Sequence, residues 1–113
     1  MRRRFGRVIN ELAKKDDKVI LIVGDIGYGV FDDFRKEHPK KFFNLGICEQ
    51  SIISFASGAA LEGLKPWVYT ITPFLIERPF EQVKLDIDQQ NVNVNLVGFA
   101  DYPTLGPSHA ELD

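Results

Sequence analysis

The feature that most constrains the fold of this chain is a continuous apolar run, Val19-Ile-Leu-Ile-Val23. The run is rich in β-branched residues, and apolar and polar residues do not alternate within it. A strand without alternation is expected to be buried on both faces, as in a parallel sheet that helices cover on both sides. The run therefore predicts an α/β protein.

The segments around this strand continue an alternation of helices and strands. Apolar residues recur at helical spacing from Phe5 to Ala13, which predicts a helix over about residues 3–15. Similar patterns predict helices over 31–37, 49–61 and 79–89, and strands over 42–45, 67–71 and 92–98. This order, with its short connections, predicts a three-layer, doubly wound and mainly parallel sheet flanked by helices.

The same order predicts where functional residues should lie. Ligands of doubly wound sheets bind beyond the carboxyl ends of the strands. In this chain those ends are residues 24–29, 45–49, 71–75 and 99–109. No internal repeat or linker interrupts the 113 residues, so we expect one domain.

Composition excludes several classes of function. The net charge of −2 gives no electrostatic reason to expect nucleic-acid binding. The longest apolar run is far shorter than the roughly 20 residues that a membrane span needs, and the first residues do not resemble a signal peptide. The single cysteine fits a reducing compartment. We therefore expect a cytoplasmic protein that binds neither nucleic acid nor membrane.

Two other kinds of site have little support. Gly24, Gly27 and Gly29 follow a strand, but their spacing reverses the order of the dinucleotide-binding fingerprint. Their predicted role is a flexible loop that lets Asp25 or Tyr28 face a ligand or a partner chain. The histidines and the cysteine share no ligand spacing, so we expect no metal site in this chain.

Glu49 lies at the predicted start of a helix, just after a predicted strand, in a segment of apolar and small residues. Its carboxylate could simply interact favourably with the helix dipole. It could equally serve a ligand at the carboxyl edge of the sheet. The spacing leaves both interpretations open.

Four motifs follow one another along the chain. They are Phe42-Phe-Asn-Leu-Gly-Ile-Cys-Glu-Gln50 with the small-residue helix after it, Gly63-Leu-Lys-Pro-Trp-Val68, Thr72-Pro-Phe-Leu75 with Arg78-Pro-Phe-Glu-Gln-Val83, and Gly106-Pro-Ser-His109. Their order resembles that in the pyrimidine-binding domain of thiamine-diphosphate enzymes, above all transketolase and 1-deoxyxylulose-5-phosphate synthase. The resemblance implies that residues 1–113 form a partial domain of this type, without the family's last helix and strand.

The resemblance also implies two catalytic residues. In the family a glutamate, matched by Glu49, bonds N1′ of the cofactor's aminopyrimidine and so promotes deprotonation of thiazolium C2 before two-carbon ketol transfer. A histidine, matched by His109, faces the reacting carbon and polarises or deprotonates substrate oxygens, which suits a group that titrates near neutrality.

Further cofactor-binding residues follow from the same motifs. An aromatic residue that stacks on the pyrimidine is matched by Phe74, whereas an ungapped count from Arg78 would place Leu75 there instead. Ile47, Thr72 and Arg78 are the other positions that the resemblance implies for cofactor binding.

The family's diphosphate site, a Gly-Asp-Gly motif followed by an asparagine, has no match in these residues. The resemblance therefore implies a partner subunit or domain that holds the diphosphate of thiamine diphosphate and a divalent metal, expected to be Mg²⁺. It also implies a dimer through the pyrimidine domain and a sugar phosphate or related ketose as substrate. Two alternatives stay open: a non-catalytic interaction module of the same fold, and the β subunit of a 2-oxo-acid dehydrogenase or decarboxylase.

Overall fold

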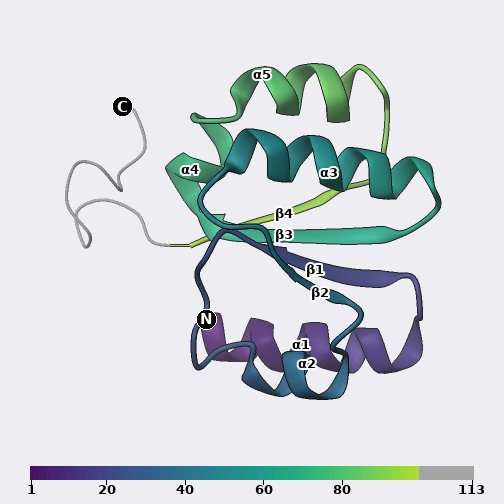
Figure 1. Ribbon diagram of the computed structural model, residues 1–113, viewed down its shortest axis with the longest axis vertical. Helices are drawn as coiled ribbons and strands as arrows, with labels where there is room; N and C mark the ends of the chain where they lie inside the picture. The colour runs from purple at the N-terminus through teal and green to yellow at the C-terminus, as the bar shows by residue number, and fades with distance from the viewer. Residues whose placement is uncertain (100–113) are drawn as a thin grey trace.

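The computed structural model describes residues 1–99, which form a sheet of four parallel strands in the order β2-β1-β3-β4. The strands are β1 (Val19–Val23), β2 (Phe42–Asn44), β3 (Lys65–Ile71) and β4 (Asn95–Phe99). Helices lie on both faces of the sheet, so the predicted three-layer α/β architecture is confirmed (Figure 1).

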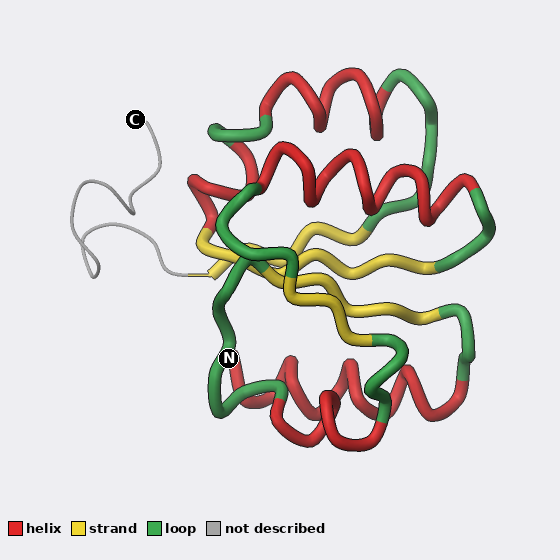
Figure 2. Tube along the Cα trace, in the orientation of Figure 1, coloured by secondary structure: helices red, strands yellow, loops and turns green. Residues whose placement is uncertain are grey.

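Two groups of helices make up the outer layers. α1 (Arg2–Lys15) and α2 (Asp32–Glu37) lie together on one face of the sheet (Figure 2). The other face carries α3 (Glu49–Leu61), α4 (Thr72–Ile76), α5 (Phe80–Gln82) and the π-helix η1 (Val83–Asp88).

β1 is the strand that joins the two layers. All its residues are buried, as its unbroken apolar sequence predicts. Val19, Leu21 and Val23 pack into the core beneath α1 and α2, whereas Ile20 and Ile22 pack into the core beneath α3. Successive side chains of a strand point to opposite faces, so this one strand supplies both cores.

Several segments differ from the sequence prediction. Residues 72–76, for which the sequence predicted neither a helix nor a strand, form the short helix α4, and Pro73 in its first turn has the backbone geometry that a helix start favours. The predicted helix over 79–89 exists as α5 and η1, but its second part has π-helical hydrogen bonding. β4 begins at Asn95 rather than at residue 92, after a turn at Asn91, whose φ of 52° lies in the left-handed region that asparagine tolerates.

Candidate active site

Glu49 is the first residue of α3 and its side chain lies at the carboxyl edge of the sheet, only 2% exposed. The carboxylate approaches the end of β1, because a Cβ atom built on Gly24 would be 3.6 Å from Glu49 Oε1. A buried carboxylate is costly unless it has a partner. That partner is Arg78, whose Nη1 donates to Glu49 Oε2 at 2.7 Å.

Arg78 also contacts Phe74. The guanidinium carbon of Arg78 lies 3.9 Å from the centroid of the Phe74 ring, within the range of a cation–π interaction. α4 carries Phe74, and Arg78 follows in the turn between α4 and α5, where its N–H donates to the Pro73 carbonyl at 3.2 Å. The structure thus brings Glu49, Phe74 and Arg78 into one group with a carboxylate, a guanidinium and an aromatic face.

The position of Leu75 bears on the alternative register. Leu75 is 1% exposed and belongs to the core beneath α3, where Ile52, Ile53 and Val68 also pack. Phe74 instead contacts the guanidinium of Arg78, which pairs with Glu49.

The other predicted cofactor residues lie apart from this group. The Thr72 hydroxyl donates to the Phe99 carbonyl at 3.4 Å, so Thr72 connects the start of α4 to the end of β4. Ile47 precedes α3 and its side chain is 70% exposed. The predicted His109 and its motif lie outside the described residues.

A second polar group follows β1 and β2. Asp25 and Asn44 exchange hydrogen bonds: Asp25 N–H donates to Asn44 Oδ1 at 2.9 Å, and Asn44 Nδ2 donates to Asp25 Oδ1 at 3.1 Å. The Tyr28 hydroxyl donates to the same Asp25 oxygen at 2.7 Å. The bonds from Tyr28 first, and from Asn44 second, lower the pKa of Asp25. Asp25 itself has a φ of 54°, a left-handed geometry that aspartate tolerates because its side chain bonds locally.

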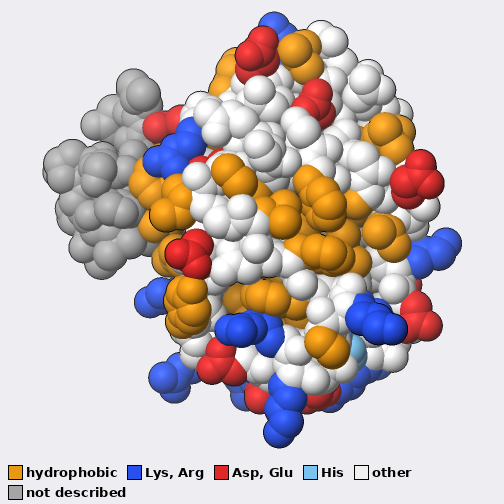
Figure 3. Space-filling view, viewed as in Figure 1, with side chains coloured by type: hydrophobic (Ala, Val, Ile, Leu, Met, Phe, Trp, Pro, Cys, Tyr) orange, Lys and Arg blue, Asp and Glu red, His pale blue; other side chains and the backbone are white. Residues whose placement is uncertain are grey.

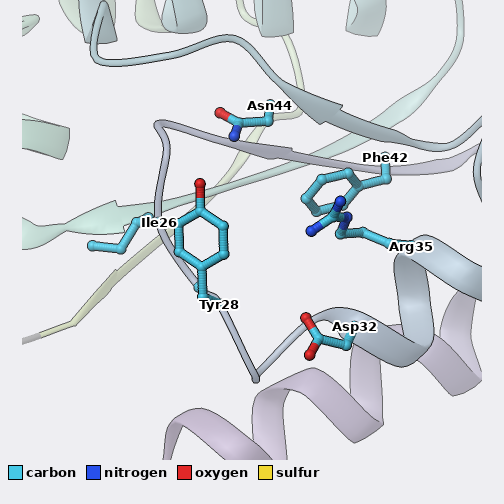
Figure 4. Close-up of a pocket in the computed structure, with 7 residues that line it drawn as sticks. Ile26, Tyr28, Asp32, Arg35, Phe42 and Asn44 are labelled. Atoms are coloured by element: carbon cyan, nitrogen blue, oxygen red, sulfur yellow. The ribbon is translucent and has the colours of Figure 1, made fainter.

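This second group borders a cavity of about 300 Å³ (Figure 4). Tyr28 extends along one side with its hydroxyl towards Asn44, and Arg35 lies against the Phe42 ring on the other side (Figure 4). Asp32 and Ile26 complete much of the lining. The expectation that the loop presents Tyr28 agrees with its 70% exposure, but Asp25 is held by its neighbours. Sequence reasoning missed Asn44, whose only signal is a polar side chain at the end of a strand.

None of the helices within residues 1–99 is long and apolar enough to cross a membrane.

Comparison with known proteins assigns the family. Residues 1–111 match the family model described as transketolase, pyrimidine binding domain. This chain therefore belongs to the family of transketolase pyrimidine-binding domains, a part of thiamine-diphosphate-dependent enzymes of transferase type.

Individual relatives agree with this assignment. A 1-deoxy-D-xylulose-5-phosphate synthase of Clostridium perfringens is 43% identical over 93 residues, which are 81% of this chain and 15% of the relative. A transketolase family protein of Sinorhizobium fredii is 36% identical over 108 residues, covering 93% of this chain and 31% of the relative. Among solved structures, a split-gene transketolase described as an inactive beta4 tetramer matches with a TM-score of 0.79 and 28% identity, over 86% of this chain and 33% of that chain. This chain corresponds to a minor part of each relative's length.

Proposed function

We propose that this chain is the pyrimidine-binding part of a thiamine-diphosphate-dependent enzyme of transketolase type, and that Glu49 is its catalytic carboxylate. The observation that carries the proposal is the position of Glu49, which is 2% exposed and lies at the carboxyl edge of a parallel sheet. The guanidinium of Arg78 contacts both the Glu49 carboxylate and the Phe74 ring. A flat heterocycle with a ring nitrogen fits between a buried carboxyl group and an aromatic face.

Glu49 would hold a proton at N1′ of the aminopyrimidine, and Phe74 would support the ring from one side. When bound, the cofactor supplies the thiazolium carbon that acts on a ketose or related carbonyl. Gly24 leaves room beside the carboxylate, since a Cβ atom there would also lie 3.3 Å from the Gly46 carbonyl oxygen and from Ile52 Cδ1. Burial keeps water away from the carboxyl group, which strengthens its hydrogen bond to a ring nitrogen. His109 would act on substrate oxygens.

The proposal includes a partner that binds the diphosphate and Mg²⁺. Its support is the small share of each relative that this chain covers, together with a structural neighbour that is itself a split-gene transketolase. The similarity to a 1-deoxy-D-xylulose-5-phosphate synthase supports a sugar phosphate or related ketose as substrate.

We also include pairing with a second pyrimidine domain in the proposal. Figure 3 shows hydrophobic side chains gathered across the middle of one face of the molecule. β2 is an edge strand of the sheet. Phe55 of α3 packs against Phe43 of β2, with the ring centroids 5.5 Å apart, and Phe55 remains 41% exposed. Phe55→Asp should reduce self-association in analytical ultracentrifugation, whereas Val8→Asp on the opposite helical layer should not.

The decisive test replaces the carboxyl group in the assembled enzyme. Glu49→Gln should slow hydrogen exchange at C2 of bound thiamine diphosphate by about 10²-fold or more, because the amide cannot manage the N1′ proton. Glu62→Gln is the matched control, since Glu62 is exposed at the other end of α3. Equal exchange rates in Glu49→Gln and the control would show that Glu49 is not the catalytic carboxylate.

A further inference from the structure

Arg78 makes both contacts that the proposed cofactor ring would need. Its guanidinium bonds the Glu49 carboxylate at 2.7 Å and lies 3.9 Å from the centroid of the Phe74 ring. A guanidinium is flat, carries N–H donors in its plane and stacks on aromatic faces. A protonated aminopyrimidine shares these properties. The Arg78 side chain therefore makes the contacts with Glu49 and Phe74 that the proposed function assigns to the ring.

The pairing has a clear physical reason. Glu49 is 2% exposed, and a carboxylate that deep requires a compensating charge or hydrogen bonds. Among residues 1–99, Arg78 is the cation that forms an ion pair with Glu49. Loss of Arg78 would leave the Glu49 carboxylate without an ion-pair partner among these residues.

Arg78 is also placed so that its side chain can leave. The side chain is 36% exposed, whereas that of Glu49 is 2% exposed, so the guanidinium approaches the carboxylate from the solvent side. Its backbone is held separately by the bond from Arg78 N–H to the Pro73 carbonyl. Rotation of the Arg78 side chain would therefore break its contacts with Glu49 and Phe74 while the backbone bond to Pro73 stays in place.

We infer that Arg78 is an internal occupant of the pyrimidine site, which pairs Glu49 and covers Phe74 until the aminopyrimidine of the cofactor displaces it. This inference rests on the proposed function, since it assumes that Glu49 and Phe74 receive the cofactor ring. Arg78 is then a positioning residue that competes with the cofactor and sets its affinity. The apparent affinity for the cofactor is then proportional to the fraction of molecules in which the Arg78 side chain has already left the site.

The test measures thiamine diphosphate binding with Mg²⁺ by isothermal titration calorimetry in the assembled enzyme. Arg78→Met removes the guanidinium and should lower the apparent Kd by about tenfold. This is the expected change if Arg78 has left the site in about a tenth of the cofactor-free molecules. Arg35→Met is the matched control, because Arg35 also lies over a phenylalanine ring, that of Phe42, at 5.5 Å but is not paired with Glu49. Its Kd should equal that of the unmodified enzyme.

Arg78→Lys provides a second variant in case Arg78→Met does not fold. Lysine keeps a charge for Glu49 but cannot stack its ammonium flat on Phe74, so its Kd should fall between those of the other two enzymes. Thermal unfolding supplies an independent readout. The cofactor should raise the melting temperature of Arg78→Met more than that of the control, because the variant begins with an unpaired Glu49 and recovers a partner on binding.

The outcomes separate the two proposals. A Kd for Arg78→Met that equals or exceeds the control value would overturn the competition and show that Arg78 instead helps to hold the cofactor. For Arg78→Lys, a Kd equal to or weaker than that of the unmodified enzyme would do the same. If the unmodified assembled enzyme binds no thiamine diphosphate, the proposed function itself fails, and the inference about Arg78 fails with it.

Discussion

The Glu49 carboxylate and the Arg78 guanidinium lie 2.7 Å apart although 29 positions separate the two residues along the chain. The pair connects the start of α3 to the turn between α4 and α5. It is asymmetric, because Glu49 is almost fully buried while more than a third of the Arg78 side chain is exposed. This asymmetry has consequences for stability as well as for ligand binding.

Removal of either partner should have unequal effects on the cofactor-free protein. Arg78→Met leaves a buried carboxylate unpaired and should lower the free energy of unfolding by about 2 kcal/mol. Glu49→Gln leaves a guanidinium that water can reach and should lower it by about 1 kcal/mol or less. Urea unfolding of both single variants and of the double variant measures the difference and the coupling. Equal losses would mean that the pair is not the compensation for buried charge that we describe.

A contact of α1 predicts the effect of a small substitution. A Cβ atom on Gly6 would collide with the backbone carbonyl of Val30, in the segment between β1 and α2. Gly6→Ala should therefore lower the free energy of unfolding by about 1–3 kcal/mol, despite the better helix propensity of alanine. Gly58→Ala in α3 is the matched control, since a Cβ atom there meets nothing within 4 Å and should raise stability by about 0.5–1 kcal/mol. A Gly6→Ala protein that is as stable as the Gly58→Ala protein would contradict the predicted collision with Val30.

The group around Asp25 predicts a pH dependence. Its pKa is lowered from the ordinary value of 3.8, chiefly by the hydrogen bond from Tyr28. A lowered folded-state pKa contributes stability that is present above the unfolded value and is lost as the pH falls through the folded value. Tyr28→Phe should raise the pKa of Asp25 towards 3.8, as followed by the carboxyl carbon signal in NMR titrations.

Asp16 serves as an internal control for this titration. Its pKa is also lowered, through Lys65 first and the Lys18 backbone second, and it lies near the amino ends of the strands. The Asp16 signal should titrate identically in the Tyr28→Phe protein. A pKa of Asp25 that does not change on loss of the hydroxyl would remove Tyr28 as the cause.

The proposed roles of Glu49 and His109 predict different kinetic losses. In the assembled enzyme, His109→Asn should reduce turnover of a ketose phosphate by about 10²- to 10⁴-fold, the usual range for loss of a general acid or base. Hydrogen exchange at C2 of the bound cofactor should stay unchanged, because that step depends on Glu49. Loss of C2 exchange in His109→Asn would show that the two roles are not separate.

Much of the fold was predictable because its signals are local. The unbroken apolar run of β1 and the helical spacing in α1 and α3 specify both the type of element and the face that each buries. α4 was not predictable, since the apolar content of Thr72–Ile76 fits a loop, a strand end or a helix equally well. The π-helical turn of η1 was also missed, because it depends on packing against α3. There the Ser57 hydroxyl donates to the Asp86 carbonyl at 2.5 Å.

The site was predictable only in part. The family resemblance supplied Glu49, Phe74 and Arg78, and the structure brings these three together. The residues alone gave no reason to pair Glu49 with Arg78, because that contact depends on how α4 turns the chain. The sequence also offered no reason to place Leu75 rather than Phe74 in the core, because that depends on which side of α4 faces the sheet.

The arrangement of β1 has a consequence for how this family can vary in length. Its side chains enter the two cores alternately, and its last residue, Val23, leads directly to Gly24 beside the Glu49 carboxylate. Deletion of one residue within β1 would exchange the faces of the residues on one side of the gap and draw Gly24 away from the carboxylate. Insertions and deletions between homologues should therefore fall in the connections between elements, and the length of β1 should be constant.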